Sequence, residues 1–273
     1  MAIRSILTNY TGSGGGAAAL RLAVQMAQKY DAHLTGAVWQ PQNPLRRRAG
    51  AIFTREIDRI LDQAEAEFVE ERRAAFTAAV TEAGLLDRSD FRVLSGKGDS
   101  ITETARGHDI LTMGGAAEGN AAGDFAVRPD VVALRSGRPV VIVPASYQKP
   151  AILETALLAW DGKRAAARAL ADAMHILGTK EKVTVLGIGE GLPSDYAADV
   201  LRLMALHGIE AELLIRPASA AGIGPTILDA CSETGAGLLI MGAYEHSKFS
   251  EDLLGGVTRD ILEQAKLPVL MSH

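Results

Sequence analysis

The sequence predicts an α/β protein made of two tandem, five-stranded, parallel-sheet domains of the Rossmann-like type. Short aliphatic runs alternate with longer helical patterns along the 273 residues, which is typical of βαβ units around a parallel sheet. Aromatic residues are 5% of the chain and hydrophobic residues 48%, so Ala, Val, Leu and Ile must build the core, as in helices packed on parallel strands. The same order of elements occurs twice, which indicates an internal duplication.

Five aliphatic runs in each half predict the strands. In the first half they cover residues 5–9, 33–39, 91–94, 110–113 and 140–143, and in the second half 156–160, 183–188, 211–215, 238–241 and 269–271. The fourth run ends in a Met-Gly pair in both halves, at Gly114 and at Gly242. The fifth run follows a proline in both halves, and a proline stops the preceding helix and favours an extended chain.

Helical patterns separate these runs. They cover residues 17–29, 52–83, 163–177, 194–206, 223–233 and 253–265. The pattern over 52–83 places apolar residues three or four apart, which predicts one apolar stripe along a long helix. Its counterpart over 194–206 is much shorter, so the two halves are expected to differ there. Residues 146–150 are the expected linker between domains covering 1–147 and 151–273.

Composition and charge exclude several classes of protein. The net charge of −5 gives no general electrostatic case for binding nucleic acid, and we interpret Arg46–Arg48 as a solvated loop. Cys231 is the single cysteine, so no intrachain disulfide forms, and we interpret it as a buried small hydrophobe. No apolar run is long enough for a membrane span or a signal-peptide core. We therefore expect a soluble protein of the cytoplasm.

In doubly wound sheets, ligands bind beyond the carboxyl ends of the strands, where the strand order reverses. After the first strand, Gly12, Gly14 and Ala17 satisfy the dinucleotide pattern GxGxxG/A. The acidic residue that this pattern requires at the end of the second strand is missing, because Asp31 precedes that strand. We therefore favour a flexible glycine-rich connection over a nucleotide-contacting loop. In the second half, Asp161 follows the first strand. It is either the N-cap of the next helix or a residue that binds the base or ribose of a nucleotide.

The carboxyl-terminal loop carries the clearest functional signal. An apolar strand runs into Gly242, a polar loop follows, and Gly255 and Gly256 precede a helix. Free backbone N–H groups at a helix N-terminus bind anions. The spacing of Gly242, Glu245, Gly255 and Gly256 resembles the pattern G-x2-G-x9-G-[ST] of nucleotide-binding universal stress proteins, and the following Val257-Thr258-Arg259 is also similar to that family.

The resemblance to the tandem form of the universal stress protein family is strong after Thr155 and weaker before it. It implies two adenine nucleotide alpha hydrolase-like domains packed as a pseudo-dimer through their last strands, and it is compatible with a homodimer of chains. It also implies a site for ATP, with Mg²⁺ if bound, or for another small anion. The residues implied in that site are Ala159, Trp160, Asp161, Ile188, Met241, Gly242, Glu245, Gly255, Gly256, Val257 and Thr258.

Two residues depart from the family pattern. Glu245 stands where ATP-binding members have glycine, and a carboxylate repels a triphosphate. Gly256 stands in place of serine or threonine, which removes one hydroxyl and its hydrogen bond. Lys248 would offset part of the negative charge, and Thr258 offers another hydroxyl. The first-half loop after Gly114 keeps no such spacing, so we interpret that site as degenerate.

No catalytic motif accompanies this loop. The histidines are scattered without metal-ligand spacing, and neither a GxSxG elbow nor a P-loop occurs. His246 and Ser247 lie in the loop and are interpreted as polar surface residues. The favoured hypothesis is a non-catalytic stress-response module that senses or carries ATP or another small anion. The alternatives are a weak ATPase and a scaffold with both pockets closed.

Overall fold

A computed structural model describes residues 2–12, 14–40, 55–95, 100–115, 128–189, 194–243 and 256–273. The first half comprises β1 (Ser5–Asn9), α1 (Gly14–Tyr30), β2 (His33–Gln40), α3 (Arg55–Glu82), the short 3₁₀ helix η2 (Leu86–Arg88), β3 (Ser89–Ser95), α4 (Ile101–Ala105), β4 (Ile110–Gly114), α5 (Pro129–Arg135) and β5 (Val140–Val143). The second half comprises β6 (Thr155–Ala159), α6 (Arg164–Leu177), β7 (Lys182–Ile188), α7 (Ser194–Leu206), β8 (Ala211–Arg216), α8 (Ile223–Thr234), β9 (Leu238–Gly242), α9 (Gly256–Gln264) and β10 (Val269–Ser272).

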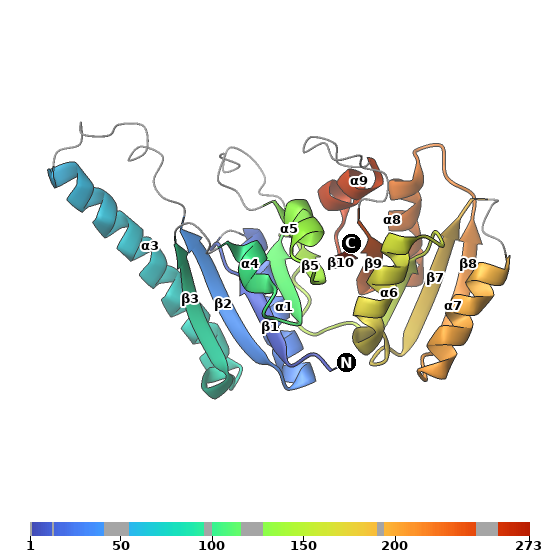
Figure 1. The fold of residues 1–273 in the computed structure, drawn as a ribbon, viewed down its shortest axis with the longest axis horizontal. Helices are drawn as coiled ribbons and strands as arrows, with labels where there is room; N and C mark the ends of the chain where they lie inside the picture. Colours follow the sequence, from blue (N-terminus) through green and yellow to red (C-terminus); the bar gives the residue numbers. More distant parts are fainter. Residues whose placement is uncertain are drawn as a thin grey trace.

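The described strands form one continuous sheet in the order β3-β2-β1-β4-β5-β10-β9-β6-β7-β8 (Figure 1). All neighbours within a half are parallel. The halves join where β5 and β10 pair antiparallel, with Leu270 opposite Val141. The predicted α/β class and the predicted pairing of the last strands are therefore confirmed.

Most predicted elements occur within a few residues of their expected bounds. Helix α1 begins three residues earlier than expected, at Gly14. Pro129 occupies the start of α5, as its fixed φ favours. Helix α4 was not predicted, although its sequence carries a capping box: the Ser100 side chain accepts a hydrogen bond from the Glu103 backbone, and the Glu103 carboxylate accepts one from the Ser100 backbone.

The two halves repeat each other in local detail. Gly12 and Gly162 follow the first strand of their halves with φ of 76° and 77°, a left-handed conformation that favours glycine. The preceding aromatic residue behaves alike in both: the Tyr10 backbone donates to β2 at 2.8 Å, and the Trp160 backbone donates to β7 at 2.9 Å. This correspondence supports the duplication that the sequence predicted.

Helices cover both faces of the sheet. One hydrophobic cluster joins α1, α3, α6 and α7 to one face, and the other joins α4, α5, α8 and α9 to the opposite face. Helix α1 follows β1 on the first face, whereas α5 follows β4 on the second. The carboxyl ends of β1 and β4 therefore border a crevice, and so do those of β6 and β9. This is the reversal point at which such folds bind ligands.

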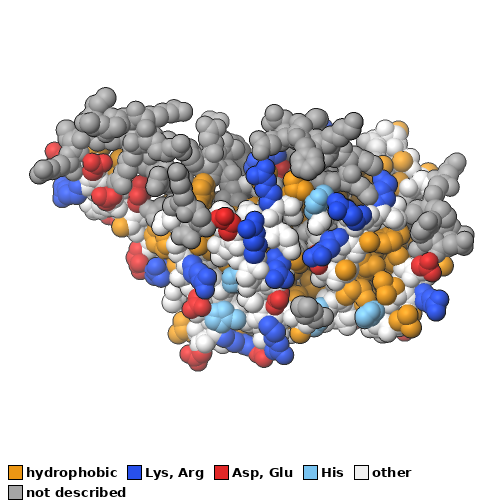
Figure 2. All heavy atoms as spheres, viewed as in Figure 1, with side chains coloured by type: hydrophobic (Ala, Val, Ile, Leu, Met, Phe, Trp, Pro, Cys, Tyr) orange, Lys and Arg blue, Asp and Glu red, His pale blue; other side chains and the backbone are white. Residues whose placement is uncertain are grey.

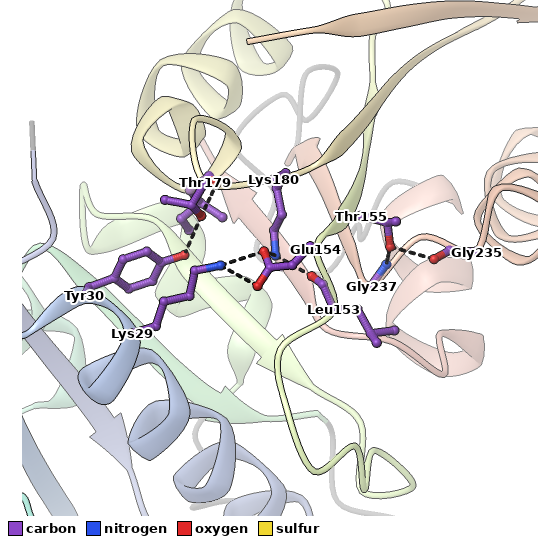
Figure 3. Close-up of polar contacts among 10 residues, drawn as sticks. Lys29, Tyr30, Leu153, Glu154, Thr155, Thr179, Lys180, Gly235 and Gly237 are labelled. Atoms are coloured by element: carbon purple, nitrogen blue, oxygen red, sulfur yellow. Dashed lines mark hydrogen bonds and ion pairs between the residues drawn. The ribbon is translucent and has the colours of Figure 1, made fainter. Parts of the chain in front are cut away.

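The seam between the halves contains an ion cluster (Figure 3). Lys29 of α1 contacts both carboxylate oxygens of Glu154 at 2.7 and 2.6 Å. Lys180 lies 3.7 Å from the same carboxylate and donates to the Leu153 carbonyl at 2.5 Å. The Lys180 side chain is only 1% exposed and lines a cavity of about 30 Å³ between the halves. Glu154 thus balances an ammonium group from each half.

The linker is also held by α1. Arg21 donates to the carbonyl of Tyr147 at 3.0 Å, and Gln25 donates to that of Lys149 at 3.0 Å. These residues and Lys29 are spaced four apart, so they share one face of the helix. The Tyr147 side chain is buried in the cluster that both halves share. The segment between the halves is therefore packed against the sheet's first helix.

Lys180 predicts a pH dependence of stability. Burial lowers its pKa from 10.5 to about 8, although Glu154 opposes this shift. Between pH 8 and 10.5 the unfolded chain binds more protons at this group than the folded chain does, so stability rises with pH. Urea unfolding should show the wild type gaining about 2–3 kcal/mol relative to Lys180→Met across this window. Parallel stability curves for the two proteins would contradict this assignment.

Candidate functional site

The candidate site lies at the carboxyl ends of β6 and β9. Ala159 ends β6 and is half-buried, and Ile188 ends β7 and is also half-buried. The side chains of Trp160 and Met241 are buried in the hydrophobic clusters on opposite faces of the sheet. Both side chains therefore contribute to the cores on either side of the sheet below this edge.

Asp161 is exposed at this edge, but it is not the N-cap of α6. Lys163 occupies the cap position and makes no side-chain cap bond. The Asp161 carboxylate instead accepts from the Lys163 backbone N–H at 3.0 Å and lies 3.8 Å from the Lys163 ammonium. The N-cap alternative for Asp161 is therefore wrong. Its carboxylate shapes the loop before the helix through a local turn bond.

Gly242 is explained by close packing between β9 and α6. A Cβ built at this position would lie 2.6 Å from the backbone nitrogen of Ala166 and 2.7 Å from Cβ of Ala165. Its counterpart Gly114 approaches α1 in the same way. A Cβ built at Gly114 would lie 2.9 Å from the backbone nitrogen of Gly16. In both halves the glycine lets the first turn of a helix lie directly on the strand end.

Helix α9 brings its N-terminus to the same edge. Figure 1 shows α9 above β9 and β10 and beside α8. Gly256 is exposed, Val257 is half-buried and Thr258 is buried. The first turn of α9 contains no acidic residue, so nothing in that turn opposes an anion. Glu245 and Gly255, with Lys248, His246 and Ser247, lie outside the described residues.

Two buried polar atoms close to this edge have no hydrogen-bond partner in the described part of the chain. They are Nε1 of Trp160 and Oγ of Ser272. Ser272 pairs in register with Gly242, and its side chain projects to the face covered by α6, since Leu270 lies in that cluster. Ser272 was not predicted as a site residue, because a serine at a strand end carries no motif.

The equivalent edge of the first half contains an arginine that the sequence analysis missed. Arg72 of α3 donates through Nε to the Thr11 carbonyl at 3.3 Å, and its guanidinium lies 3.5 Å from the centre of the Phe68 ring. A Cβ at Gly12 would lie 3.0 Å from this guanidinium. The long helix therefore places a cation over the loop after β1. Only the fold reveals this, since Arg72 lies 61 residues from Thr11.

Other chemistry is absent from the described ranges. No group of His, Cys, Asp and Glu residues there is arranged to hold a metal ion. Cys231 is buried, and burial raises the pKa of its thiol to about 12, which makes it a poor nucleophile. Within the same residues, no helix is long and apolar enough to cross a bilayer.

The second half of the chain matches a known protein family. Residues 153–273 match the universal stress protein family. This part of the chain is therefore similar to universal stress protein domains. Its fold and its strand-end glycine agree with the resemblance found in the sequence. The first half repeats the same order of strands and helices.

Solved structures extend this likeness to the whole chain. A universal stress protein from Archaeoglobus fulgidus DSM 4304 is 16% identical, with 98% of this chain and 96% of that chain covered and a TM-score of 0.71. A proposed universal stress protein from Pseudomonas aeruginosa UCBPP-PA14 is also 16% identical, with 99% and 93% covered and a TM-score of 0.59. At this identity the likeness establishes the shared tandem fold. No curated protein sequence matches the chain.

Proposed function

We propose that the protein is a non-catalytic stress-response module whose second domain senses or carries ATP or another small anionic ligand. The ligand would lie at the carboxyl ends of β6 and β9, with its negative charge at the N-terminus of α9. Binding would act by favouring one conformation or partner rather than by turnover. The first domain would keep the fold without the ligand site.

The observation that carries this proposal is the N-terminus of α9 at the reversal point of the sheet. Its first turn contains no acidic side chain, and unpaired N–H groups at such a position bind phosphate oxygens. The family spacing from Gly242 to Gly255 is retained. Adenine nucleotide is therefore the ligand class that this arrangement suits best, with Mg²⁺ carried by the phosphates.

The two halves support unequal roles. In the first half, Arg72 lies against Gly12 at the corresponding edge. In the second half, Lys163 and Asp161 pair locally at the exposed loop after β6, and the counterpart helix α7 is less than half as long as α3. These differences support a ligand site in the second half rather than in the first.

A weak ATPase and a closed scaffold are the alternative functions. The described residues offer no metal cluster, and the sequence has no recognisable general base, so turnover is the less favoured alternative. Glu245 would favour the scaffold if its carboxylate fills the phosphate position. Hydrolysis of ATP above the blank would support the first alternative, and the absence of any nucleotide binding would support the second.

The test is calorimetric titration with ATP, with and without Mg²⁺, of the wild type, Glu245→Gly and Glu245→Gln. We expect both variants to bind at least about tenfold more tightly than the wild type, which corresponds to about 1.4 kcal/mol of relieved repulsion. Glu263→Gln is the matched control, because Glu263 lies exposed on α9 and its removal changes the net charge equally.

The outcomes separate the parts of the proposal. Tighter binding in both Glu245 variants but not in Glu263→Gln supports a site beside residue 245. Equal affinities in all four proteins would show that Glu245 is no impediment. If none of the four proteins releases or absorbs heat when ATP is added, the proposal that the chain binds nucleotide would be wrong.

A further inference from the structure

Strand β8 is an outer strand of the sheet, and none of the other described strands covers its outer edge. Among the described strands it pairs only with β7. Leu213 and Ile215, which lie on the same face of β8, are 37% and 53% exposed. The opposite outer strand, β3, has charged Asp90 and Arg92 in alternate positions and is covered through Phe91 by Phe76 and Arg73 of α3. The two outer strands therefore differ in the apolar surface that they expose, which is larger on β8.

The backbone direction of β8 follows from one hydrogen bond. The Arg216 carbonyl accepts from the Gly189 backbone at 2.9 Å, so the N–H and C=O groups of Arg216 point toward β7. Backbone groups of successive strand residues point to alternate sides. Those of Leu213 and Ile215 therefore point outward, away from β7. An unpaired row of this kind is a template for another strand.

We propose that a second copy of this chain docks on β8, with the two β8 strands antiparallel and Leu214 opposite the partner's Leu214. This is an interaction surface in addition to the proposed ligand site and does not depend on it. An antiparallel pair related by a two-fold axis uses the same surface of both copies and closes after two chains. A residue whose backbone groups point outward must lie opposite another such residue of the partner. Only every second shift of one strand along the other meets this condition.

The sequence of β8 is complementary to itself in this register. Leu213 lies opposite the partner's Ile215, and Glu212 lies opposite the partner's Arg216. Directly opposed apolar pairs and opposite charges stabilise antiparallel strands, whereas like charges destabilise them. Each charge already has an intrachain partner, Lys182 for Glu212 and Glu233 for Arg216. Pro217, which has no N–H, ends the ladder.

Apolar side chains close to β8 also favour a second copy of the chain as the partner on this edge. Helix α7 packs on β8 and exposes Leu203 and Leu206, the latter by 76%. Figure 2 shows hydrophobic side chains gathered over the region of α6 and α7 on the right of the view. The β5–β10 junction joins two parallel units through the same antiparallel edge pairing. Docking through β8 would repeat this arrangement between chains.

Sedimentation of the full chain over a wide range of concentrations tests the proposal. We expect a concentration-dependent dimer in the wild type and a dissociation constant raised at least about tenfold by Ile215→Lys, because two like lysines enter a two-fold interface. Leu86→Lys is the matched control, since Leu86 is 52% exposed and lies next to the opposite outer strand. A wild type that stays monomeric, or equal effects of both variants, would overturn the proposal.

The register has its own test. In this arrangement the two Leu214 Cα atoms face each other across the two-fold axis at about 4.5 Å, which is within disulfide reach. We expect Leu214→Cys to form a covalent dimer on mild oxidation, with the retained secondary structure checked by circular dichroism. Leu213→Cys should cross-link much less, because it faces the partner's Ile215. Equal cross-linking of the two variants would exclude this register, and binding of other proteins without self-association would exclude the second copy as occupant.

Discussion

Replacing Gly242 with alanine is expected to lower the free energy of unfolding by about 3 kcal/mol. The added Cβ would lie 2.6 Å from the backbone nitrogen of Ala166, and a backbone atom in a helix cannot move aside as the end of a side chain can. Gly242 does not have a positive φ, so the expected loss is steric. Urea unfolding monitored by circular dichroism measures it.

Gly256→Ala is the control for this prediction. A Cβ at Gly256 meets no atom of the described residues within 4 Å, and alanine in place of glycine at a helical position changes stability by no more than about 1 kcal/mol, in the favourable direction. Gly114→Ala should behave like Gly242→Ala, because its Cβ would lie 2.9 Å from the nitrogen of Gly16. Similar stabilities of the Gly242 and Gly256 variants would show that β9 and α6 are not packed this closely.

Neutralising Glu154 is expected to lower the free energy of unfolding by about 2 kcal/mol. Glu154→Gln keeps the size of the side chain but removes the charge that balances Lys29 and Lys180. Lys180 is almost wholly buried, and an ammonium group left without its counter-charge in such a place is costly. Guanidinium or urea unfolding at neutral pH provides the measurement, with salt held constant.

A double-mutant cycle identifies which lysine is responsible. Adding Lys180→Met to Glu154→Gln should recover most of the lost stability, because the uncompensated charge is removed. Adding Lys29→Met should recover little, since the Lys29 side chain is 23% exposed and water solvates its charge. Equal recovery by the two lysine substitutions would argue against a special role for the buried one.

Most of the fold could be predicted from local patterns. The bounds of β1, β5 and α7 agree with the predicted ranges, because short aliphatic runs specify the two strands and a local helical pattern specifies α7. The brief helix α4 was missed, since five residues are too few to show a helical period. Its capping box was the available signal.

The candidate site could be predicted in part. Repeated Met-Gly pairs located the carboxyl ends of β4 and β9, and the resemblance named the loop that follows. The interpretation of Asp161 as an N-cap failed because the choice of cap depends on where α6 begins, and Lys163 takes that position. Arg72 was missed because its contact with Thr11 joins residues that the sequence places far apart. Glu245 and Gly255 lie outside the described residues, so their role in the site stays a prediction.

Gly242 illustrates how the two levels of information differ. The sequence identified it as a glycine between a strand and a loop, and the family pattern suggested a ligand. The folded chain adds a second reason, because α6 occupies the space that a side chain would need. Backbone-to-backbone approach between distant segments leaves no trace in local periodicity.

Alternation of aliphatic strands with helices, and its repetition, was enough to establish an α/β protein with two similar halves, because these properties depend on neighbours within a few residues. The order of the strands across the seam, the burial of Lys180 between the halves and the outward direction of β8 depend on contacts between residues far apart in the chain. Such contacts are selected by packing and burial over the whole molecule, and only the assembled sheet specifies them.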